Sequence, residues 1–246
     1  MTVSIAVLKV IEKQSGKKLP DLCSYVAGHS LGEYTALCAA GSFSLSDTAK
    51  LLKIRGNAMA QSVEKGKGSM AALIGIDFAK AQEIADNAKG SNICQAANDN
   101  GGGQVVISGH SEAIDKAIAI APEYGVKKAV KLSVSAPFHC ELMQPAAIKM
   151  QEALDNVKIN GPSVPVVANV TASKVTNTDE IKELLVKQVT GMVRWRESIE
   201  YLKNNNINNF VEIGAGKVLS GLVKRIDRSL VSQPVATPED IEKLLS

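Results

Sequence analysis

Residues 28–32, Gly-His-Ser-Leu-Gly, constrain the fold of this chain more than any other segment. They have the pattern G-x-S-x-G and lie between an apolar run at 23–27 and a helix-forming run at 33–40. This order predicts a strand that turns sharply into a helix, and a Cβ at either glycine is expected to clash in so tight a turn. The turn lifts the Ser30 hydroxyl clear of the sheet. Ser30 is therefore a candidate nucleophile, the alternative being a glycine-bracketed turn with an unreactive serine.

The helix that follows the turn starts with free N–H groups, the first of them on Leu31. Such groups point to the place where negative charge develops when a serine attacks an acyl group. Leu31 is therefore a candidate oxyanion donor.

A serine hydroxyl needs a base to take its proton, and the chain has only three histidines. His29 adjoins Ser30 in a sharp turn, where neighbouring side chains diverge, so we expect it to line the pocket. His110 is typical of a surface loop. His139 follows Pro137 at the end of a predicted strand, and the sequence favours it as general base and acid over a purely structural histidine. No suitable carboxylate lies between Ser30 and His139, so we expect a Ser-His dyad oriented by a backbone carbonyl.

Composition excludes several classes of protein. The chain has 246 residues, of which 45% are hydrophobic and 22% charged, as in ordinary globular proteins. No apolar stretch is long enough to cross a bilayer and no secretory signal is recognisable, so we expect a cytoplasmic protein without a membrane partner. The four cysteines are scattered without metal-ligand spacing. They predict buried thiols, with no metal site and no disulfide.

Charge argues against nucleic acid as a partner, because the net charge is only +3 and aromatic residues make up 4% of the chain. Basic residues do cluster, at Lys127 and Lys128 and again at Lys224 and Arg225. These clusters could attract an acidic protein or a phosphate-bearing ligand, or they could simply be solvated faces.

The periodicity of the sequence predicts an α/β protein built from two parts. Within 66–135 it indicates strand, helix, two strands, helix and strand, the ferredoxin-like order, at 70–76, 79–88, 93–97, 104–108, 112–124 and 129–134. We therefore predict a ferredoxin-like subdomain at 66–135, inserted into a hydrolase-like main domain with a parallel sheet at 1–65 and 136–246. In the main domain we expect helices at 5–12, 46–63, 141–154, 178–189, 196–204 and 218–225, and strands at 164–169 and 210–213.

Arg55 is the second informative residue. It lies within the apolar stripe of the predicted helix 46–63, and a buried charge needs a partner. Arginine offers a fork of donors that matches a carboxylate. Arg55 could hold the carboxylate of an acyl substrate, or it could form an internal ion pair with Glu33; the sequence leaves both open.

Several motifs together resemble the malonyl-CoA:acyl carrier protein transacylases of bacterial fatty-acid synthesis, and the likeness covers almost the whole chain. The segments that carry it are 28–34 (GHSLGEY), 55–56 (RG), 104–109 (QVVISG), 134–140 (VSAPFHC), 193–195 (VRW) and 212–219 (EIGAGKVL).

This resemblance implies transfer of a malonyl group from coenzyme A to the phosphopantetheine thiol of acyl carrier protein, through an ester on a serine. It implies no cofactor, because the coenzyme A thioester is a substrate. Partners are then malonyl-CoA and an acyl carrier protein bound by the two basic clusters, and a monomer is expected.

The resemblance also implies a role for each matching residue. Ser30 resembles the nucleophile, His139 its base and Arg55 the residue that binds the malonyl carboxylate. Gln188 matches the residue whose main-chain carbonyl orients the histidine. Asn98 and Asn100 fall where members of the family line the cleft between the domains.

One departure concerns the beginning of the family pattern. The family normally starts with a strand that ends in a Gly-Gln-Gly loop and supplies a second oxyanion donor, and this chain begins after that segment. We therefore expect an unpaired sheet edge, and either a misplaced start codon or a shortened form with impaired activity. Two alternatives remain open at this point: a weakly active or inactive form that only binds the carrier protein, and a serine esterase that passes the acyl group to water.

Overall fold

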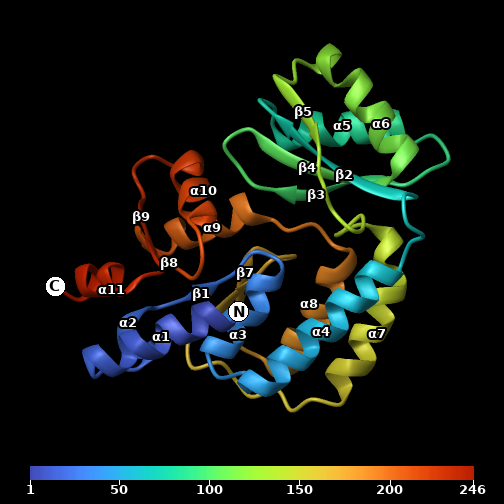
Figure 1. The fold of residues 1–246 in the computed structure, drawn as a ribbon. Helices are drawn as coiled ribbons and strands as arrows, with labels where there is room; N and C mark the ends of the chain where they lie inside the picture. The colour runs from blue at the N-terminus through green and yellow to red at the C-terminus, as the bar shows by residue number, and fades with distance from the viewer.

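The computed structural model describes residues 1–246, the whole chain. A four-stranded antiparallel sheet in the order β3-β4-β2-β5 forms one part of the molecule, at the upper right of Figure 1. The segments of this part are β2 (Gly68–Ile74), α5 (Phe78–Lys89), β3 (Cys94–Asp99), β4 (Gln104–His110), α6 (Ser111–Ile120) and β5 (Lys128–Lys131). The helices bury a core of alanine, leucine and isoleucine against the sheet. This is the ferredoxin-like subdomain, whereas its boundaries at 66 and 135 stay a prediction.

The second helix of the subdomain is shorter than the sequence predicted. It ends at Ile120 and continues as a 3₁₀ turn, η1 (Ala121–Tyr124). Pro122 explains the change, because proline has no N–H to donate to the carbonyl four residues earlier and so interrupts the α-helical hydrogen-bond pattern.

The main body is α/β and carries most of the helices. They are α1 (Thr2–Ser15), α2 (Leu19–Leu22), α3 (Leu31–Ala39), α4 (Leu45–Gln61), the 3₁₀ turn η2 (Glu141–Met143), α7 (Gln144–Asp155), α8 (Thr178–Thr190), α9 (Trp195–Asn204), α10 (Val218–Ile226) and α11 (Pro238–Leu245). Its strands are β1 (Val26–Ala27), β6 (Val166–Ala168), β7 (Ser173–Val175), β8 (Asn209–Ile213) and β9 (Val231–Val235). The largest core cluster lies under α3, α4, α7 and α8 and positions the residues of the site.

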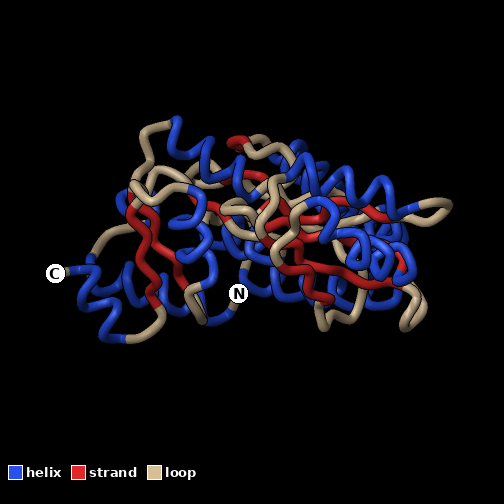
Figure 2. The backbone as a smooth tube through the Cα atoms, turned by 90° about the horizontal axis from the view of Figure 1, so that it is seen from above, coloured by secondary structure: helices blue, strands red, loops and turns tan.

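The strands of the main body form two small sheets. One has the order β1-β6-β7, with β1 and β6 parallel and β6 and β7 antiparallel; the other pairs β8 with β9 in parallel. Figures 1 and 2 both place β8 and β9 near the C-terminus, apart from the four-stranded sheet. The sequence analysis missed β7 and β9, because β7 has only three residues and β9 contains Pro234.

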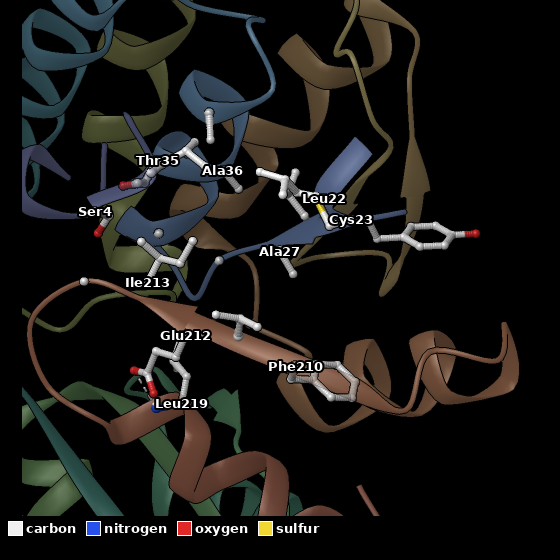
Figure 3. A pocket seen from close by; sticks show the side chains of 18 of the residues that line it. Ser4, Leu22, Cys23, Ala27, Thr35, Ala36, Phe210, Glu212, Ile213 and Leu219 are labelled. Carbon is white, nitrogen blue, oxygen red and sulfur yellow. Dashed lines mark hydrogen bonds between the residues drawn. The ribbon is translucent and has the colours of Figure 1, made fainter. Parts of the chain in front are cut away.

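A cavity of about 1120 Å³ separates the two sheets of the main body. Figure 3 shows Ala27 at the end of β1 on one side of it and Phe210 and Ile213 of β8 on the other. Neither β1 nor β8 has another strand on the side that lines the cavity. The expected unpaired edge is therefore present, and it belongs to two strands that face each other.

Two further findings concern the cysteines and the character of the helices. Cys94 and Cys140 are buried, whereas Cys23 and Cys38 are only partly buried, so the prediction of four buried thiols was wrong for two of them. None of the helices combines the length and the apolar character that crossing a membrane requires.

Candidate active site

Ser30 occupies the turn between β1 and α3, with φ 53° and ψ −108°. We call residues 28–32 the elbow. A Cβ on Gly28 would lie 2.0 Å from the carbonyl carbon and oxygen of Gly32, so only glycine fits there. A Cβ on Gly32 would meet nothing within 4 Å. The expectation that both glycines are needed for steric reasons was wrong for Gly32, because its Cα faces open space.

His139 lies beside Ser30, although 109 positions separate the two in sequence. Its Nε2 is 2.7 Å from the Ser30 hydroxyl oxygen. Its Nδ1 is 2.8 Å from the carbonyl oxygen of Gln188 and 3.1 Å from that of Gly191. Carbonyl oxygens only accept hydrogen bonds, so Nδ1 must carry the proton and Nε2 is left free to accept the serine proton. No carboxylate bonds this imidazole.

Burial makes the imidazole of His139 hard to charge. Desolvation, followed by the nearby guanidinium of Arg55, lowers the pKa of His139 to about 3, while the hydrogen bond to the carbonyl of Gln188 acts in the opposite direction. The resting histidine is therefore neutral, the form that a general base requires.

Arg55 brings a positive charge to the same point. It lies on α4 among the buried residues of that helix, and its Nη2 donates to the Ser30 hydroxyl oxygen at 2.9 Å and to Gln188 Oε1 at 3.0 Å. The guanidinium carbon lies 5.7 Å from the ring centroid of Tyr34. Its Nε is buried and has no hydrogen-bond partner. Burial lowers the pKa of Arg55. The guanidinium forms no ion pair, because both of its hydrogen-bond partners are neutral.

The alternative ion pair between Arg55 and Glu33 is not formed. The side-chain amide of Gln188 lies between them: its Oε1 accepts from Arg55, and its Nε2 donates to Glu33 Oε2 at 2.7 Å. The carboxylate and the guanidinium are thus linked only through a neutral group.

The other predicted site residues lie around this centre. His29 Nε2 donates to Asn100 Oδ1 at 2.9 Å, a contact between the elbow and the end of β3, and the ring centroid of His29 is 5.6 Å from that of Trp195. Burial lowers the pKa of His29. Asn98 is buried in β3, where its backbone forms a parallel bridge with Val193.

Leu31 begins α3 and is exposed, and its N–H makes no hydrogen bond within the chain. A free N–H beside the nucleophile can donate to an oxyanion. No group of three histidine, cysteine, aspartate or glutamate side chains is placed to hold a metal ion.

Comparison with known proteins assigns this arrangement to a family. The model of the acyl transferase domain matches residues 2–239. The chain belongs to this family of acyl transferases. The malonyl CoA-acyl carrier protein transacylase of Bacillus subtilis is 45% identical over 243 residues, which are 98% of this chain and 75% of that protein. The enzyme of the same name from Escherichia coli is 41% identical over 97% of this chain and 76% of its own length.

Solved structures of acyl transferases agree with this assignment. The acyl-carrier-protein-S-malonyltransferase of Bartonella henselae has a TM-score of 0.96 and 52% identity, covering 99% of this chain and 77% of its own. A malonyl-transacylase solved in complex with a type II PKS acyl-carrier protein has a TM-score of 0.94 and 36% identity, covering 99% of this chain and 77% of its own. The resemblance recognised in the sequence is thereby confirmed.

Two polar residues at the centre of this acyl transferase were missed as site residues. Glu33 and Asn169 are 2% and 1% exposed, yet both make hydrogen bonds to the groups around Ser30. Glu33 could have been noticed as a carboxylate on the apolar face of the elbow helix, because such a group is seldom buried without a partner. For Asn169, at the end of a short strand, the sequence offered no signal.

Proposed function

We propose that this acyl transferase moves a malonyl group from coenzyme A to the phosphopantetheine thiol of an acyl carrier protein. One observation supports the choice of malonyl most strongly. The buried guanidinium of Arg55 lies 2.9 Å from the Ser30 oxygen and has no carboxylate partner of its own. An acyl group with a terminal carboxylate would supply the missing negative charge while its thioester carbon lies at the serine.

In the first half-reaction the Ser30 oxygen attacks the thioester carbon of malonyl-CoA. The hydroxyl proton passes to Nε2 of His139, 2.7 Å away, and the carbonyl oxygen becomes an oxyanion. As the carbon–sulfur bond breaks, the coenzyme A thiolate leaves and takes the proton from His139. A malonyl ester on Ser30 remains.

The second half-reaction runs in the opposite sense. The carrier-protein thiol gives its proton to His139 and its sulfur attacks the ester carbon. The bond to Ser30 breaks, and the serine oxygen recovers the proton from His139. The sequence is ping-pong and needs no prosthetic group, because side chains supply the nucleophile, the base and the carboxylate site.

We assign the Leu31 N–H as an oxyanion donor in both halves. It is free of intramolecular hydrogen bonds and begins the helix that follows the nucleophile. One such donor contributes about a hundredfold to a thousandfold in turnover in other enzymes.

The carrier protein is proposed to bind the two basic clusters, which lie on either side of one turn. Lys127 packs against Gly75 and Arg225 packs against Gly102. The approach is so close that a Cβ added to Gly75 would lie 2.6 Å from Lys127 Cγ, and one added to Gly102 would lie 2.6 Å from Arg225 Cβ. Gly75 itself donates to the carbonyl of Gly103 at 2.7 Å. The basic groups from the subdomain and from α10, including exposed Lys128 and Lys224, therefore form one positive face suited to an acidic partner. The prediction of a monomer and of a place in the cytoplasm is part of this proposal.

Mass spectrometry of the intact protein tests the proposal. After incubation with malonyl-CoA, we expect a malonyl adduct on Ser30 that disappears when a carrier protein with its phosphopantetheine thiol is added. Ser30→Ala is the control and must remain unmodified. If the wild-type protein never carries the adduct, malonyl transfer is refuted.

The same experiment separates the two alternatives. Free malonate released without any carrier protein identifies an esterase. Carrier protein bound without an adduct on Ser30 identifies a form that only binds.

A further inference from the structure

Asn169 lies at the carboxyl end of β6, next to the elbow. The parallel ladder between β1 and β6 pairs Val26 with Val166 and Ala27 with Val167. Beyond the ladder, β1 enters the elbow at Gly28, while β6 ends at Ala168 and is followed by Asn169. Asn169 is therefore the neighbour of the elbow across the sheet, with a side chain that is almost completely buried.

The side-chain amide of Asn169 continues the ladder where the backbone can no longer do so. Its Oδ1 accepts from the Ser30 N–H at 2.7 Å, and its Nδ2 donates to the Gly28 carbonyl at 2.8 Å. One amide group thus binds the backbone at the nucleophile and two residues before it.

Ser30 has a conformation that needs such support. Its φ of 53° is rare for a residue with a Cβ, and such a backbone persists only where the surrounding structure holds it. The same conformation directs the hydroxyl toward Nε2 of His139. A change of the Ser30 backbone would therefore move the oxygen away from its base.

Asn169 is itself held on both sides. Its N–H donates to Glu33 Oε2 at 3.1 Å, and its carbonyl accepts from the Arg194 N–H at 2.9 Å. Glu33 also accepts from Gln188 Nε2, and the Glu33 N–H donates to the Ser30 carbonyl at 3.0 Å. The buried carboxylate thus ties the end of β6 to the first turn of α3.

We propose that Asn169, supported by Glu33, is the positioning residue that holds the nucleophilic elbow in its reactive conformation. Asn169 does not contact the acyl group and acts only through the backbone of Ser30. The inference rests on the proposed function to the extent that Ser30 is the nucleophile. Its test therefore uses a reagent that contains neither malonate nor coenzyme A.

The first test measures the rate at which an alkyl fluorophosphonate labels Ser30, followed by intact mass. The serine oxygen forms a bond to phosphorus, fluoride leaves, and the hydroxyl proton passes to His139. We expect Asn169→Ala to react about a hundredfold more slowly than the wild type, as misplacement of a reacting group by about 1 Å does in other enzymes. The matched control is Asn156→Ala, which removes a side-chain bond to the carbonyl of Glu152 at an exposed helix end and should leave the rate unchanged.

The second test uses Asn169→Asp, which keeps the size of the side chain. A protonated aspartic acid can accept from Ser30 and donate to Gly28 as the amide does, whereas the ionised form can only accept. We expect the rate relative to wild type to fall by about tenfold or more as the pH rises from 5 to 9, once the new carboxyl ionises. Glu33, His139, Arg55 and His29 face this position in both proteins, so the ratio removes whatever their ionisation contributes.

The outcomes are distinct. A folded Asn169→Ala that reacts as fast as wild type overturns the proposal, and so does a ratio for Asn169→Asp that is independent of pH. The aspartate variant decides the matter if the alanine variant does not fold. Wild-type protein that reacts with the fluorophosphonate but never with malonyl-CoA refutes the proposed function and leaves the role of Asn169 standing.

Discussion

Arg55 is a cation at 6% exposure whose hydrogen-bond partners are two neutral oxygens, on Ser30 and Gln188. Asp99, which is also buried, has an ionic partner in Arg196. The difference suggests that the partner of Arg55 arrives with the substrate. At the scale of single residues, the specificity of the site thus depends on one unpaired charge.

Arg55→Ala should abolish selectivity for malonyl. Two charge-assisted hydrogen bonds to the carboxylate would be lost, so kcat/KM for malonyl-CoA should fall on the order of a hundredfold to ten-thousandfold. Transfer from acetyl-CoA, which has no carboxylate, should fall much less. Steady-state kinetics with both thioesters measure the two losses in kcat/KM, and equal losses would contradict the assignment. Arg55→Lys keeps the charge but not the paired N–H donors of the guanidinium, so its kcat/KM for malonyl-CoA should lie between those of the wild type and Arg55→Ala.

His139 should stay neutral over the ordinary pH range. Because burial lowers its pKa to about 3, its ring resonances should not titrate between pH 5 and 8 in NMR spectra. The resonances are assigned by their absence from the spectrum of His139→Gln. Between about pH 3 and 6.5 the unfolded chain binds a proton at this position that the folded chain does not. The free energy of unfolding from this group therefore falls as the pH drops through that window. An NMR midpoint near 6.5 would show that the imidazole is solvated.

The elbow is the element on which the site depends most. It joins a strand of two residues to a helix of nine, and its geometry requires glycine at one end only. Its other supports come from outside the element: Asn169 at the end of β6 and Gln188 on α8, whose Nε2 donates to the Ser30 carbonyl at 3.0 Å. A local motif thus sets the path of the chain, while distant strands and helices hold it.

Gly28→Ala and Gly32→Ala should differ although both alter the same motif. The first puts a Cβ into the backbone of Gly32 and should cost about 3 kcal/mol of stability together with reactivity at Ser30. The second places a methyl group in open space on a helix and should be neutral or stabilise by about 0.5 kcal/mol. Urea unfolding and fluorophosphonate labelling of both variants measure the two effects. Equal damage from both would mean that the elbow has another backbone path.

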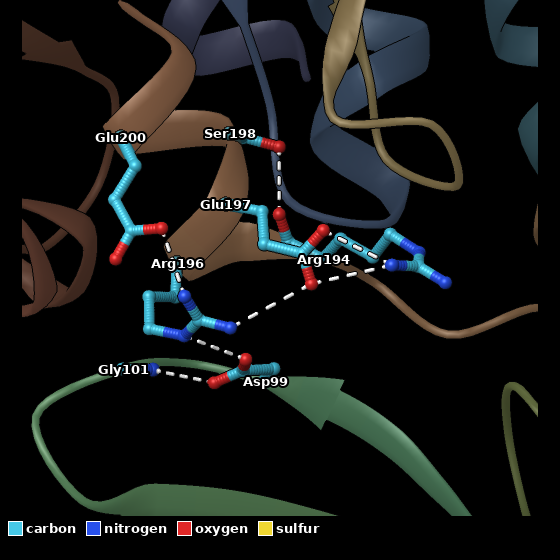
Figure 4. A network of polar contacts seen from close by, with 7 residues as sticks. All are labelled: Asp99, Gly101, Arg194, Arg196, Glu197, Ser198 and Glu200. Atoms are coloured by element: carbon cyan, nitrogen blue, oxygen red, sulfur yellow. Dashed lines mark hydrogen bonds and ion pairs between the residues drawn. The ribbon is translucent and has the colours of Figure 1, made fainter. Parts of the chain in front are cut away.

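At the scale of the whole molecule, the end of β3 joins the subdomain to the main body. Asp99 is buried and accepts from Arg196 Nε at 2.8 Å, while Arg196 also pairs with Glu200 of α9, as Figure 4 shows. The backbones of Asp99 and Val193 are bonded at 3.0 Å. Asn100, the residue after Asp99, is hydrogen-bonded to His29 of the elbow. These contacts therefore set the position of the subdomain relative to the elbow.

Arg196→Ala should loosen this junction, since it leaves the Asp99 carboxylate buried without its cation. We expect a loss of about 2 kcal/mol in the free energy of unfolding, measured by urea denaturation. Arg194→Ala, which removes a more exposed pair with Glu197, is the matched control and should change stability by less than about 1 kcal/mol. Equal effects of the two variants would argue against a special role for the buried pair.

Charge reversal on the basic face should affect only the second substrate. Lys224→Glu together with Arg225→Glu should raise KM for the carrier protein by about tenfold or more, most strongly at low salt, because complementary charge accelerates encounter. Malonylation of Ser30 by malonyl-CoA should be unchanged. Lys149→Glu on α7, also exposed, is the control; a KM that does not move would place the carrier protein on another face.

The sequence by itself determined the elements that depend on local chemistry. Glycine and serine in the elbow, together with apolar periodicity, were enough to predict most helices and the order of the subdomain. The same local signals singled out Ser30, His139 and Arg55 as candidates. Short β7 and proline-containing β9 escaped, because such strands are defined by their partners.

Only the tertiary structure decided how these candidates are arranged. Whether Arg55 meets Glu33 depends on Gln188, which is 133 positions away from Arg55, and the conformation of Ser30 depends on Asn169, which is 139 positions away from Ser30. The physical reason is that a hydrogen bond depends on distances of a few tenths of an ångström. Local propensity decides what each segment becomes, whereas such distances arise only when segments far apart in the sequence pack together.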